Sequence, residues 1–336
     1  MAWYQTTGND AEIILSSRVR FARNLSDYPF GAKLSSEKAN ELIEKVGTLL
    51  SQNGFEKIDF SQSSPLEAAS LVEKHYISRE FAEKKTPHAL MMNEPCGYAV
   101  MLCEEDHMRL QCILPGLALE EAYGSLCKLD DLIDEHFPIA YSETFGYLTH
   151  CPTNLGTGMR ASVMMFLPAL TMAGRIGALS GQLSKLGIAM RGLYGEGTSA
   201  QGCLYQISNQ ITLGITEEDS IKKLTEVISQ IKENELSLRR LINEEKNPDL
   251  VDRICRAEGT LRHAFMLSST EFISLFADIR LGISLGLIRD ISYETIDSLL
   301  ISLLPATLIL SEPNLPKNEK ARDILRAKRI KEALSR

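Results

Sequence analysis

The chain has 336 residues, of which 44% are hydrophobic and 24% charged, and its formal net charge at pH 7 is −8. This composition is typical of a globular protein with a sizeable core, and the acidic balance argues against a general nucleic-acid binder, which usually presents a basic face. The first residues show no signal-peptide pattern, and no apolar run is long enough to span a membrane without a charge or a breaker. We therefore expect a cytoplasmic protein that binds neither nucleic acid nor membrane.

The seven cysteines are scattered along the chain and form no CxxC pair. An odd number of unclustered cysteines argues against a disulfide framework or a zinc cluster and favours a reducing cytosol. Most of these thiols are expected to be small buried side chains. Cys151 differs from the others, because it begins a polar loop.

Predicted strands and helices alternate irregularly through the first two thirds of the chain. Strand-like runs occupy 12–22, 88–103, 107–116 and 203–214, and helical patterns occupy 36–50, 119–137 and 160–187. Successive strands follow one another around turns such as "NEPCG", instead of each being followed by a helix. This order predicts an α+β fold with a largely antiparallel sheet flanked by helices.

The pattern changes at Thr216. Thr216 and Asp219 form a capping-box pattern, and apolar residues then repeat at helical spacing up to residue 231. From there to Arg336 the chain is almost wholly helical, with breaks near 247 and 311. We therefore predict two domains, a sheet-containing domain over 1–216 and a helical domain over 217–336.

Arginines recur at the edges of the predicted strands. They are Arg18, Arg20, Arg23, Arg109, Arg160 and Arg191. In a strand, Arg18 and Arg20 point to the same face, and guanidinium groups bind phosphate through paired, charge-assisted hydrogen bonds. Several of them in one cleft would hold a polyphosphate, although the chain has neither GxxxxGK[ST] nor GxGxxG. Each arginine alone would equally suit an exposed surface or a salt bridge.

Three loops carry further candidate residues. "CEEDH" (103–107) places three carboxylates and a histidine between two strands, which suits a general base or a cation site, or simply an exposed acidic turn. "CPTNLGTGMR" (151–160) joins Cys151 to residues of tight turns. "GEG" (195–197) holds Glu196 in a loop that either closes over a site or only forms a hairpin tip.

Together these segments resemble the phosphagen (guanidino) kinase family. "LSSRVRFARNL", "EEDHMRLQ", "CPTNLGTGMRASVMMFLPAL", "RGLYGEG" and "YQISNQITLG" follow the family's order over about 11–216. No helical domain precedes "SSRVR" and a helical domain follows, as in the bacterial protein-arginine kinases (McsB type). The resemblance implies the phosphagen kinase, glutamine-synthetase-like catalytic fold. It also implies transfer of the γ-phosphoryl group of ATP, with Mg²⁺, to arginine side chains of proteins.

The resemblance also implies roles for individual residues. Glu105 would orient the substrate guanidinium and accept its proton, Cys151 would contact that guanidinium, and Glu196 would belong to the closing loop. The Mg²⁺ would be carried by ATP, with no metal site built from protein side chains alone. The implied ATP-binding residues are Ser16, Ser17, Arg18, Val19, Arg20, His75, Arg109, Arg160, Ala161, Ser162, Val163, Met164, Arg191, Gly192, Leu193, Tyr194, Gly195 and Glu196.

A second motif lies in the helical domain. "RDILRA" (322–327) resembles the RDxxRA motif of protein-arginine kinases, which implies an allosteric phosphoarginine pocket formed by Arg322, Asp323, Arg326 and Ala327. On a helix Arg322 and Arg326 share a face. A solvent-exposed basic helix without a binding pocket would show the same sequence pattern. The resemblance further implies a homodimer, protein substrates with exposed arginine, an activating adaptor (McsA type) and a Clp-type protease that receives the marked proteins.

Two positions depart from the family pattern. Cys103 stands where family members commonly have asparagine, and Ser199 or Ala200 stands where many have a glutamate. Neither change removes a predicted catalytic residue, so we expect an active kinase. Two alternatives stay open: a kinase for free arginine or another small guanidino compound, and a non-catalytic phosphoarginine reader.

Overall fold

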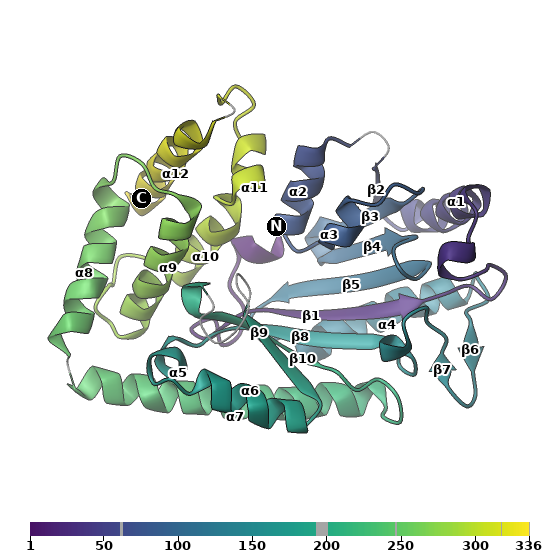
Figure 1. Cartoon of the computed structure of the whole chain (residues 1–336), viewed down its shortest axis with the longest axis horizontal. Helices are drawn as coiled ribbons and strands as arrows, with labels where there is room; N and C mark the ends of the chain where they lie inside the picture. Colours follow the sequence, from purple (N-terminus) through teal and green to yellow (C-terminus); the bar gives the residue numbers. More distant parts are fainter. Residues whose placement is uncertain (61–62, 193–200, 246, 317, 336) are drawn as a thin grey trace.

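An eight-stranded antiparallel sheet forms the centre of the computed structural model, and a group of helices closes one end of it (Figure 1). The structure describes residues 1–336 apart from 61–62, 193–200, 246, 317 and 336. The strand order is β2-β3-β4-β5-β1-β8-β10-β9. The strands are β1 (Ile14–Arg23), β2 (Glu56–Asp59), β3 (Ala89–Asn93), β4 (Tyr98–Leu102), β5 (Met108–Pro115), β8 (Met159–Phe166), β9 (Ile188–Gly192) and β10 (Leu204–Asn209), and β6 (Tyr141–Ser142) and β7 (Gly146–Tyr147) form a separate hairpin.

Helices precede, follow and connect these strands. The first part of the chain contains α1 (Ser36–Gln52), α2 (Pro65–Glu73), α3 (Arg79–Ala82), α4 (Leu119–Asp134), α5 (Pro168–Met172), α6 (Ile176–Lys185) and α7 (Glu217–Glu245). The C-terminal helices are α8 (Pro248–His263), α9 (Ser269–Ser284), α10 (Tyr293–Ser302), α11 (Pro305–Leu310) and α12 (Glu319–Leu334). Short 3-10 turns include η1 (Trp3–Gln5), η3 (Glu94–Cys96) and η4 (Pro152–Asn154). The α+β prediction is confirmed.

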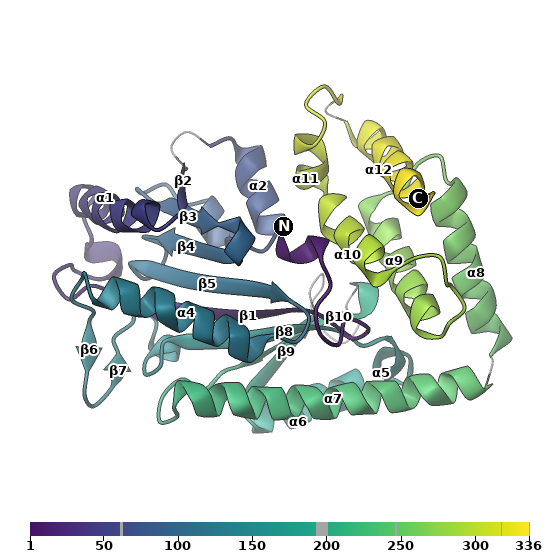
Figure 2. The same ribbon diagram turned by 180° about the vertical axis from the view of Figure 1, so that it is seen from behind.

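The two faces of the sheet pack against different partners. One face packs against α1, α4, α6 and α7, and α4 and α7 lie in front of the sheet in the view from behind (Figure 2). Val19, Ala161 and Val163 belong to the apolar core on this side. On the other face, Phe166 and Leu204 pack with η1 and the C-terminal helices in a second core. Because side chains alternate along a strand, the central strands β1, β5 and β8 contribute to both cores. The rest of the second face carries the polar side chains described below.

The long helix α7 begins where the sequence predicts a change of character. The Thr216 hydroxyl accepts a hydrogen bond from the Asp219 N–H at 3.0 Å, which confirms the predicted cap. Ile221, Leu224 and Ile228 are buried against the sheet side of the molecule, as their spacing predicts. The division into domains at 216 stays a prediction.

The helix predicted over 160–187 is partly wrong. Its first residues form β8, and only α5 and α6 are helical. β8 alternates only at its start, where Arg160 and Ser162 are polar, and its second half, from Val163 to Phe166, is buried on both faces and continues into α5 without a polar break. By contrast, the "NEPCG" turn is confirmed: η3 and Gly97, at φ +72°, connect β3 to β4.

Two contacts join the C-terminal helices to the sheet-bearing part of the chain. The Glu73 carboxylate, at the end of α2, accepts hydrogen bonds from the N–H groups of Ala306 and Thr307, each at 2.8 Å, and so caps α11. Arg280 on α9 is fully buried and donates to main-chain oxygens of Ala11 and Glu12. These contacts attach the C-terminal helices to the sheet-bearing part of the chain.

Candidate active site

Five arginines share the face of the sheet that the α1, α4, α6 and α7 layer leaves uncovered. Arg18 and Arg20 are two residues apart on β1, so their side chains point to the same face. Arg20 lies directly opposite Arg160 on β8. The registers of β5 with β1, and of β9 with β10 and β8, bring Arg109 and Arg191 to the same face. We call these five residues the arginine face. The sequence predicts the convergence of Arg18 and Arg20, and the sheet order adds the other three.

The arginine face holds more positive charge than the protein itself neutralises. Burial, together with Arg109 and Arg160, lowers the pKa of Arg18 to about 10, and burial with the neighbouring arginines lowers the pKa of Arg20 well below its usual value. Within the described residues, only Arg109 of the five forms a salt bridge. Among the described residues, the buried Nε atoms of Arg18 and Arg20 have no hydrogen-bond partner. Unsatisfied, clustered guanidinium groups fit the triphosphate of ATP.

Arg23 does not join this cluster. It lies on the opposite face, where it is fully buried and pairs with Asp130 at 2.7 Å. Its guanidinium also donates to the carbonyl oxygen of Thr157 at 3.0 Å and lies 3.4 Å from the ring centre of Tyr147. Arg23 therefore stabilises the fold beneath the loop of Cys151 and has no role in the cleft.

The two glutamates of "CEEDH" have different surroundings. Glu104 accepts a hydrogen bond from Arg109 at 2.6 Å and one from the Ser78 hydroxyl at 2.8 Å. Burial alone would raise the pKa of Glu104, but Arg109 and the hydrogen bonds outweigh burial and lower it. Glu105 is exposed at the turn, with its side chain free to meet a substrate. Glu104 orients Arg109, a role that the sequence did not reveal because adjacent glutamates look alike.

Asp106 connects this turn to the loop of Cys151. Its carboxylate accepts hydrogen bonds from the His150 N–H and from the Asn24 side chain, both at 2.6 Å. Asn24 is buried and in turn accepts from the His107 N–H at 2.8 Å. His150, the residue before Cys151, is therefore attached to the same turn that carries Glu105. No sequence signal identified Asn24, a polar residue just after a strand.

The "CPTNLGT" loop has the special backbone geometry that its glycines predict. Gly156 and Gly158 have φ values of +108° and +60°, and a Cβ on Gly156 would collide with the carbonyl oxygen of Thr212. The Thr212 hydroxyl donates to Leu155 at 2.8 Å, which braces the loop from the end of β10. Cys151 is partly exposed, and its Sγ lies 3.0 Å from the Thr153 hydroxyl.

His75 lies beside the arginine face. Burial and the positive charge of Arg18 lower the pKa of His75 to about 3, so its ring is neutral at pH 7. Its buried Nε2 has no hydrogen-bond partner in the part of the chain that the structure describes, and its backbone has a left-handed φ of +62°. Gln111, on the face of β5 that carries Arg109, donates to the His75 carbonyl at 2.9 Å. The predicted place of His75 next to the nucleotide is consistent with this position.

The remaining predicted ATP-binding residues divide between the two faces. Ser16, Ser162 and Met164 lie on the face of the arginines. Ser17, Val19, Ala161 and Val163 point to the opposite face, and the Ser17 hydroxyl donates to the carbonyl oxygen of Gly116 at 2.8 Å. The sequence alone could not tell which of these residues face the arginines, because it does not show which face of the sheet the helices leave uncovered.

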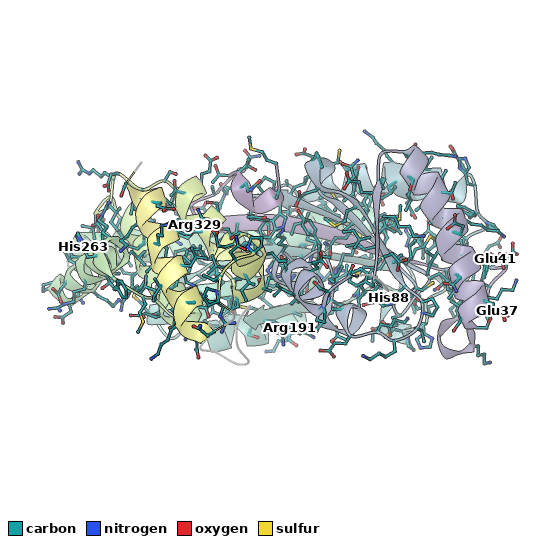
Figure 3. The ribbon with its side chains drawn as sticks, turned by 90° about the horizontal axis from the view of Figure 1, so that it is seen from above. Glu37, Glu41, His88, Arg191, His263 and Arg329 are labelled. Atoms are coloured by element: carbon teal, nitrogen blue, oxygen red, sulfur yellow. The ribbon has the colours of Figure 1, made fainter. Side chains whose placement is uncertain are left out.

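The loop after β9 lies largely outside the described residues. Arg191 is exposed on β9, near the middle of the molecule in the view from above, and Gly192 ends the strand (Figure 3). The predicted residues Leu193, Tyr194, Gly195 and Glu196, together with Ser199 and Ala200, fall outside the part that the structure describes.

The "RDILRA" motif lies on α12 as predicted, with Arg326 facing inward. Arg326 is 1% exposed and donates to the carbonyl oxygens of Leu303 and Leu267 and to Asp323, at 3.1, 2.7 and 2.6 Å. Ala327 is also buried, whereas Arg322 is only partly buried. Arg326 therefore anchors α12, and Arg322 is the arginine of the motif that is open to an added ligand.

Two general properties apply to the described part of the chain. It contains no group of three or more histidine, cysteine, aspartate or glutamate side chains arranged to hold a metal ion. None of its helices combines the length and the apolarity needed to cross a membrane.

Comparison with known proteins gives matches along the whole chain. Residues 37–238 match the model of the ATP:guanido phosphotransferase C-terminal catalytic domain, and residues 247–336 match that of the protein-arginine kinase McsB C-terminal domain. The protein-arginine kinase of Syntrophomonas wolfei subsp. wolfei is 41% identical, covering 99% of this chain and 95% of that protein. The protein-arginine kinase of Clostridium acetobutylicum is 40% identical, covering 99% of each.

Solved structures share the fold. The duplicated taurocyamine kinase from Schistosoma mansoni, with bound transition-state analogue components, superposes with a TM-score of 0.63 and 26% identity. That match covers 70% of this chain and 35% of the duplicated protein. Lombricine kinase superposes with a TM-score of 0.60 at 21% identity over 70% of each chain, a likeness of fold alone.

Proposed function

The chain belongs to the ATP:guanido phosphotransferase family, and from this premise we propose that it is a protein-arginine kinase, which phosphorylates arginine side chains of proteins with ATP. The observation that carries the proposal is the similarity to protein-arginine kinases over 99% of the chain, C-terminal helices included. The arginine face and the Cys151 loop support the phosphoryl-transfer part of it. The earlier expectation of this family is confirmed.

The proposed reaction follows from the residue types in the cleft. The arginine face binds the phosphates of ATP, with Mg²⁺ held on the triphosphate, and neutralises the charge that develops during transfer. Glu105 binds the substrate guanidinium and takes a proton from the attacking nitrogen, while Cys151 contacts the same group. The nitrogen then forms a bond to the γ-phosphorus as the bond to the β,γ-bridging oxygen breaks, and ADP leaves.

Positioning is the main task of such a site, because an arginine nitrogen is a poor nucleophile. The guanidinium pKa lies above about 12, so at pH 7 its lone pairs are delocalised and a proton must leave during attack. Asp106 and Asn24 contribute by attaching the Cys151 loop to the Glu105 turn. The hydrogen-bonded turn thereby sets where the guanidinium lies relative to the phosphates.

The C-terminal motif suggests regulation by the product. We propose that Arg322, Asp323, Arg326 and Ala327 form a phosphoarginine pocket, in which Arg322 binds the phosphate and Asp323 the guanidinium. The proposal extends to a cytoplasmic homodimer, an activating adaptor, and transfer of marked proteins to a Clp-type protease. Arg322→Ala should weaken phosphoarginine binding, measured by calorimetry, without reducing ATP binding.

A kinase assay tests the central proposal. Purified protein is incubated with Mg-ATP and unfolded casein, and phosphoarginine is detected by mass spectrometry under non-acidic conditions. We expect label on casein arginines, lost in Glu105→Ala. Label on free arginine alone would identify a small-guanidino kinase, and binding of phosphoarginine without ATP binding would identify a reader.

A further inference from the structure

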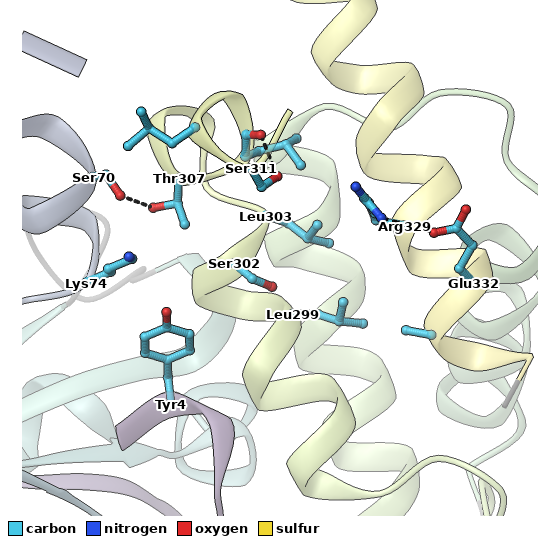
Figure 4. A pocket seen from close by; sticks show the side chains of 13 residues that line it. Tyr4, Ser70, Lys74, Leu299, Ser302, Leu303, Thr307, Ser311, Arg329 and Glu332 are labelled. Carbon is cyan, nitrogen blue, oxygen red and sulfur yellow. Dashed lines mark hydrogen bonds and ion pairs between the residues drawn. The ribbon is translucent and has the colours of Figure 1, made fainter. Parts of the chain in front are cut away.

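A cavity of about 550 Å³ lies where the two ends of the chain meet (Figure 4). Its walls come from η1 and α2 on one side and from α10, α11 and α12 on the other. This volume is in the range of pockets that hold small organic molecules. The cavity is separate from the arginine face, and none of the four residues of the "RDILRA" pocket lines it.

Two polar groups at the η1–α2 end of the cavity are candidates to bind a ligand. The Tyr4 hydroxyl and the Lys74 ammonium group point toward the same space (Figure 4). Tyr4 is 8% exposed, and among the described residues its hydroxyl has no hydrogen-bond partner. Lys74 likewise forms no salt bridge with any described carboxylate. A hydroxyl and an ammonium group that both face the cavity without a partner form a site for an anion.

The remaining wall is apolar or already paired within the protein. The hydroxyls of Ser302, Thr307 and Ser311 donate to the Ser298 carbonyl oxygen, the Glu73 carboxylate and the Leu308 carbonyl oxygen, at 2.7, 2.8 and 2.8 Å. Leu299, Leu303 and Leu308 line the middle of the cavity. On the far wall, Arg329 pairs with Glu312 at 3.0 Å and with Glu332 at 3.5 Å, so its charge is satisfied within the protein. Burial, with a smaller effect of Glu94, raises the pKa of Tyr4 to about 12, which keeps its hydroxyl a donor at pH 7.

We propose that this cavity binds a small amphipathic anion, a carboxylate or phosphate on an apolar body. The anionic group accepts hydrogen bonds from the Tyr4 hydroxyl and the Lys74 ammonium group, and the apolar body packs against Leu299, Leu303 and Leu308. Such a ligand would touch both ends of the chain. It would also hold Lys74, whose carbonyl oxygen accepts from the Trp3 indole at 3.0 Å and which directly precedes His75.

The test uses the full-length protein with the fluorescent anion 8-anilinonaphthalene-1-sulfonate as the probe. Saturating ATP is present throughout, so that the probe does not report on the arginine face. We expect one saturable site per chain, with displacement by decanoate or by phenyl phosphate. Displacement by decanoate alone would identify a carboxylate site, and displacement by phenyl phosphate alone would identify a phosphate site.

Three variants locate the probe. Lys74→Met and Tyr4→Phe should each weaken binding about tenfold, the loss of roughly one charge-assisted or buried hydrogen bond. Leu303→Trp should abolish binding by filling the cavity. The matched control is Lys222→Met, on the exposed side of α7, which should bind as the wild type does.

Two results would overturn the proposal. Absence of saturable binding with ATP present, or unchanged affinity in both Lys74→Met and Tyr4→Phe, would show that the cavity is not an anion site. These two variants remove only one polar group each. They therefore remain informative if Leu303→Trp fails to fold.

Discussion

At the scale of single residues, the arginine face sets two guanidinium groups against each other. Arg20 and Arg160 are direct partners across β1 and β8, an arrangement in which like charges destabilise a sheet. Burial and the charges of Arg191 and Arg109 lower the pKa of Arg160. This lowering has the same cause as the destabilisation, the repulsion between neighbouring positive charges. The unliganded fold thus tolerates a repulsion that a bound polyphosphate would remove.

Arg160→Met should therefore change affinity and stability in opposite directions. Loss of one charge-assisted contact should weaken ATP binding by about 10- to 100-fold, whereas loss of a like charge should raise the unfolding midpoint without nucleotide. Calorimetric titration and thermal unfolding measure the two effects. Arg256→Met, at an exposed ion pair on α8, is the control and should leave ATP affinity unchanged. A parallel loss of affinity and stability would contradict this account.

Substitutions of the two glutamates of the "CEEDH" turn should change different kinetic constants. Glu105→Gln should lower kcat by about 100-fold or more, the usual contribution of a general base, with no change in the unfolding midpoint because the side chain is exposed. Glu104→Gln should instead raise KM for ATP, because Arg109 loses its partner. Steady-state kinetics on a protein substrate distinguish the two. Normal turnover in Glu105→Gln would refute the assignment of the base.

His75 should make stability depend on pH. Its pKa is about 3 in the folded protein and about 6.5 when unfolded, so the unfolded chain binds more protons between these values. The contribution to stability is complete above pH 6.5 and is lost as pH falls, by at most about 1.4 kcal/mol per pH unit. His75→Asn, which suits the left-handed backbone, should flatten the loss between pH 6.5 and 5 in urea unfolding.

The control for this measurement is an exposed histidine. His136→Asn, just after α4, should leave the pH dependence of unfolding as in the wild type. Equal slopes for the wild type and His75→Asn would show that His75 is not held neutral by burial and by Arg18.

Single residues also show how far the sequence alone could lead. Arg18 and Arg20 were predictable as neighbours on one face, because side-chain alternation along a strand is a local property. Glu104 and Asp106 were not distinguishable from Glu105, because their roles depend on partners far along the chain, Asn24 and His150 among them. The sequence gives the residue types, whereas the hydrogen-bond partners of each side chain depend on the order of the strands in the sheet.

At the scale of secondary-structure elements, α11 begins with a cap from another part of the chain. Both carboxylate oxygens of Glu73 are used, by the Ala306 N–H and by the N–H and hydroxyl of Thr307. The charge also suits the positive end of the helix. The cap of α11 is therefore a link between α2 and the C-terminal helices.

Glu73→Gln should destabilise the protein by about 1–2 kcal/mol, because an amide group cannot replace both acceptor oxygens or the charge. Urea unfolding followed by circular dichroism measures the change. Glu80→Gln, at an exposed position on the neighbouring α3, should change stability by less than about 0.5 kcal/mol. Equal effects of the two substitutions would rule out a structural role for the cap.

Elements also differ in how well the sequence predicts them. The helix from Glu217 was predictable, because its cap and its apolar spacing are both local signals. β8 was not, because only its first residues alternate, and the apolar run from Val163 onward is buried on both faces and suits a buried helix equally well. The breaks between α8 and α9 and between α9 and α10 were also missed, since no proline marks them.

At the scale of the whole molecule, the sheet and the C-terminal helices share one core. Phe166 and Leu204 from the sheet pack in the same cluster as Phe272 and Phe276 from α9. A buried ion pair of Arg239 and Glu235, at 2.8 Å, lies at this junction. The sequence divides into two patterns near 216, whereas each of the two cores contains residues from both sides of that position.

A chain that ends at 245 should therefore fail as an independent unit. It would expose the large apolar side chains of the second core, each worth about 1.5–3 kcal/mol when buried. We expect the full chain to unfold in one cooperative calorimetric transition and the fragment to aggregate or to melt without one. A fragment with a wild-type melting temperature would show that the catalytic part folds alone.

The two joints between the parts also bear on how the protein can be recombined with its relatives. Arg280 donates to main-chain oxygens, which every sequence supplies, so that joint would survive in a chimera of two parent kinases. The Glu73 carboxylate also accepts from the Thr307 hydroxyl, so this joint keeps all its hydrogen bonds only if the two side chains are inherited together. Functional chimeras should accordingly be those in which position 73 and the segment 305–307 come from one parent.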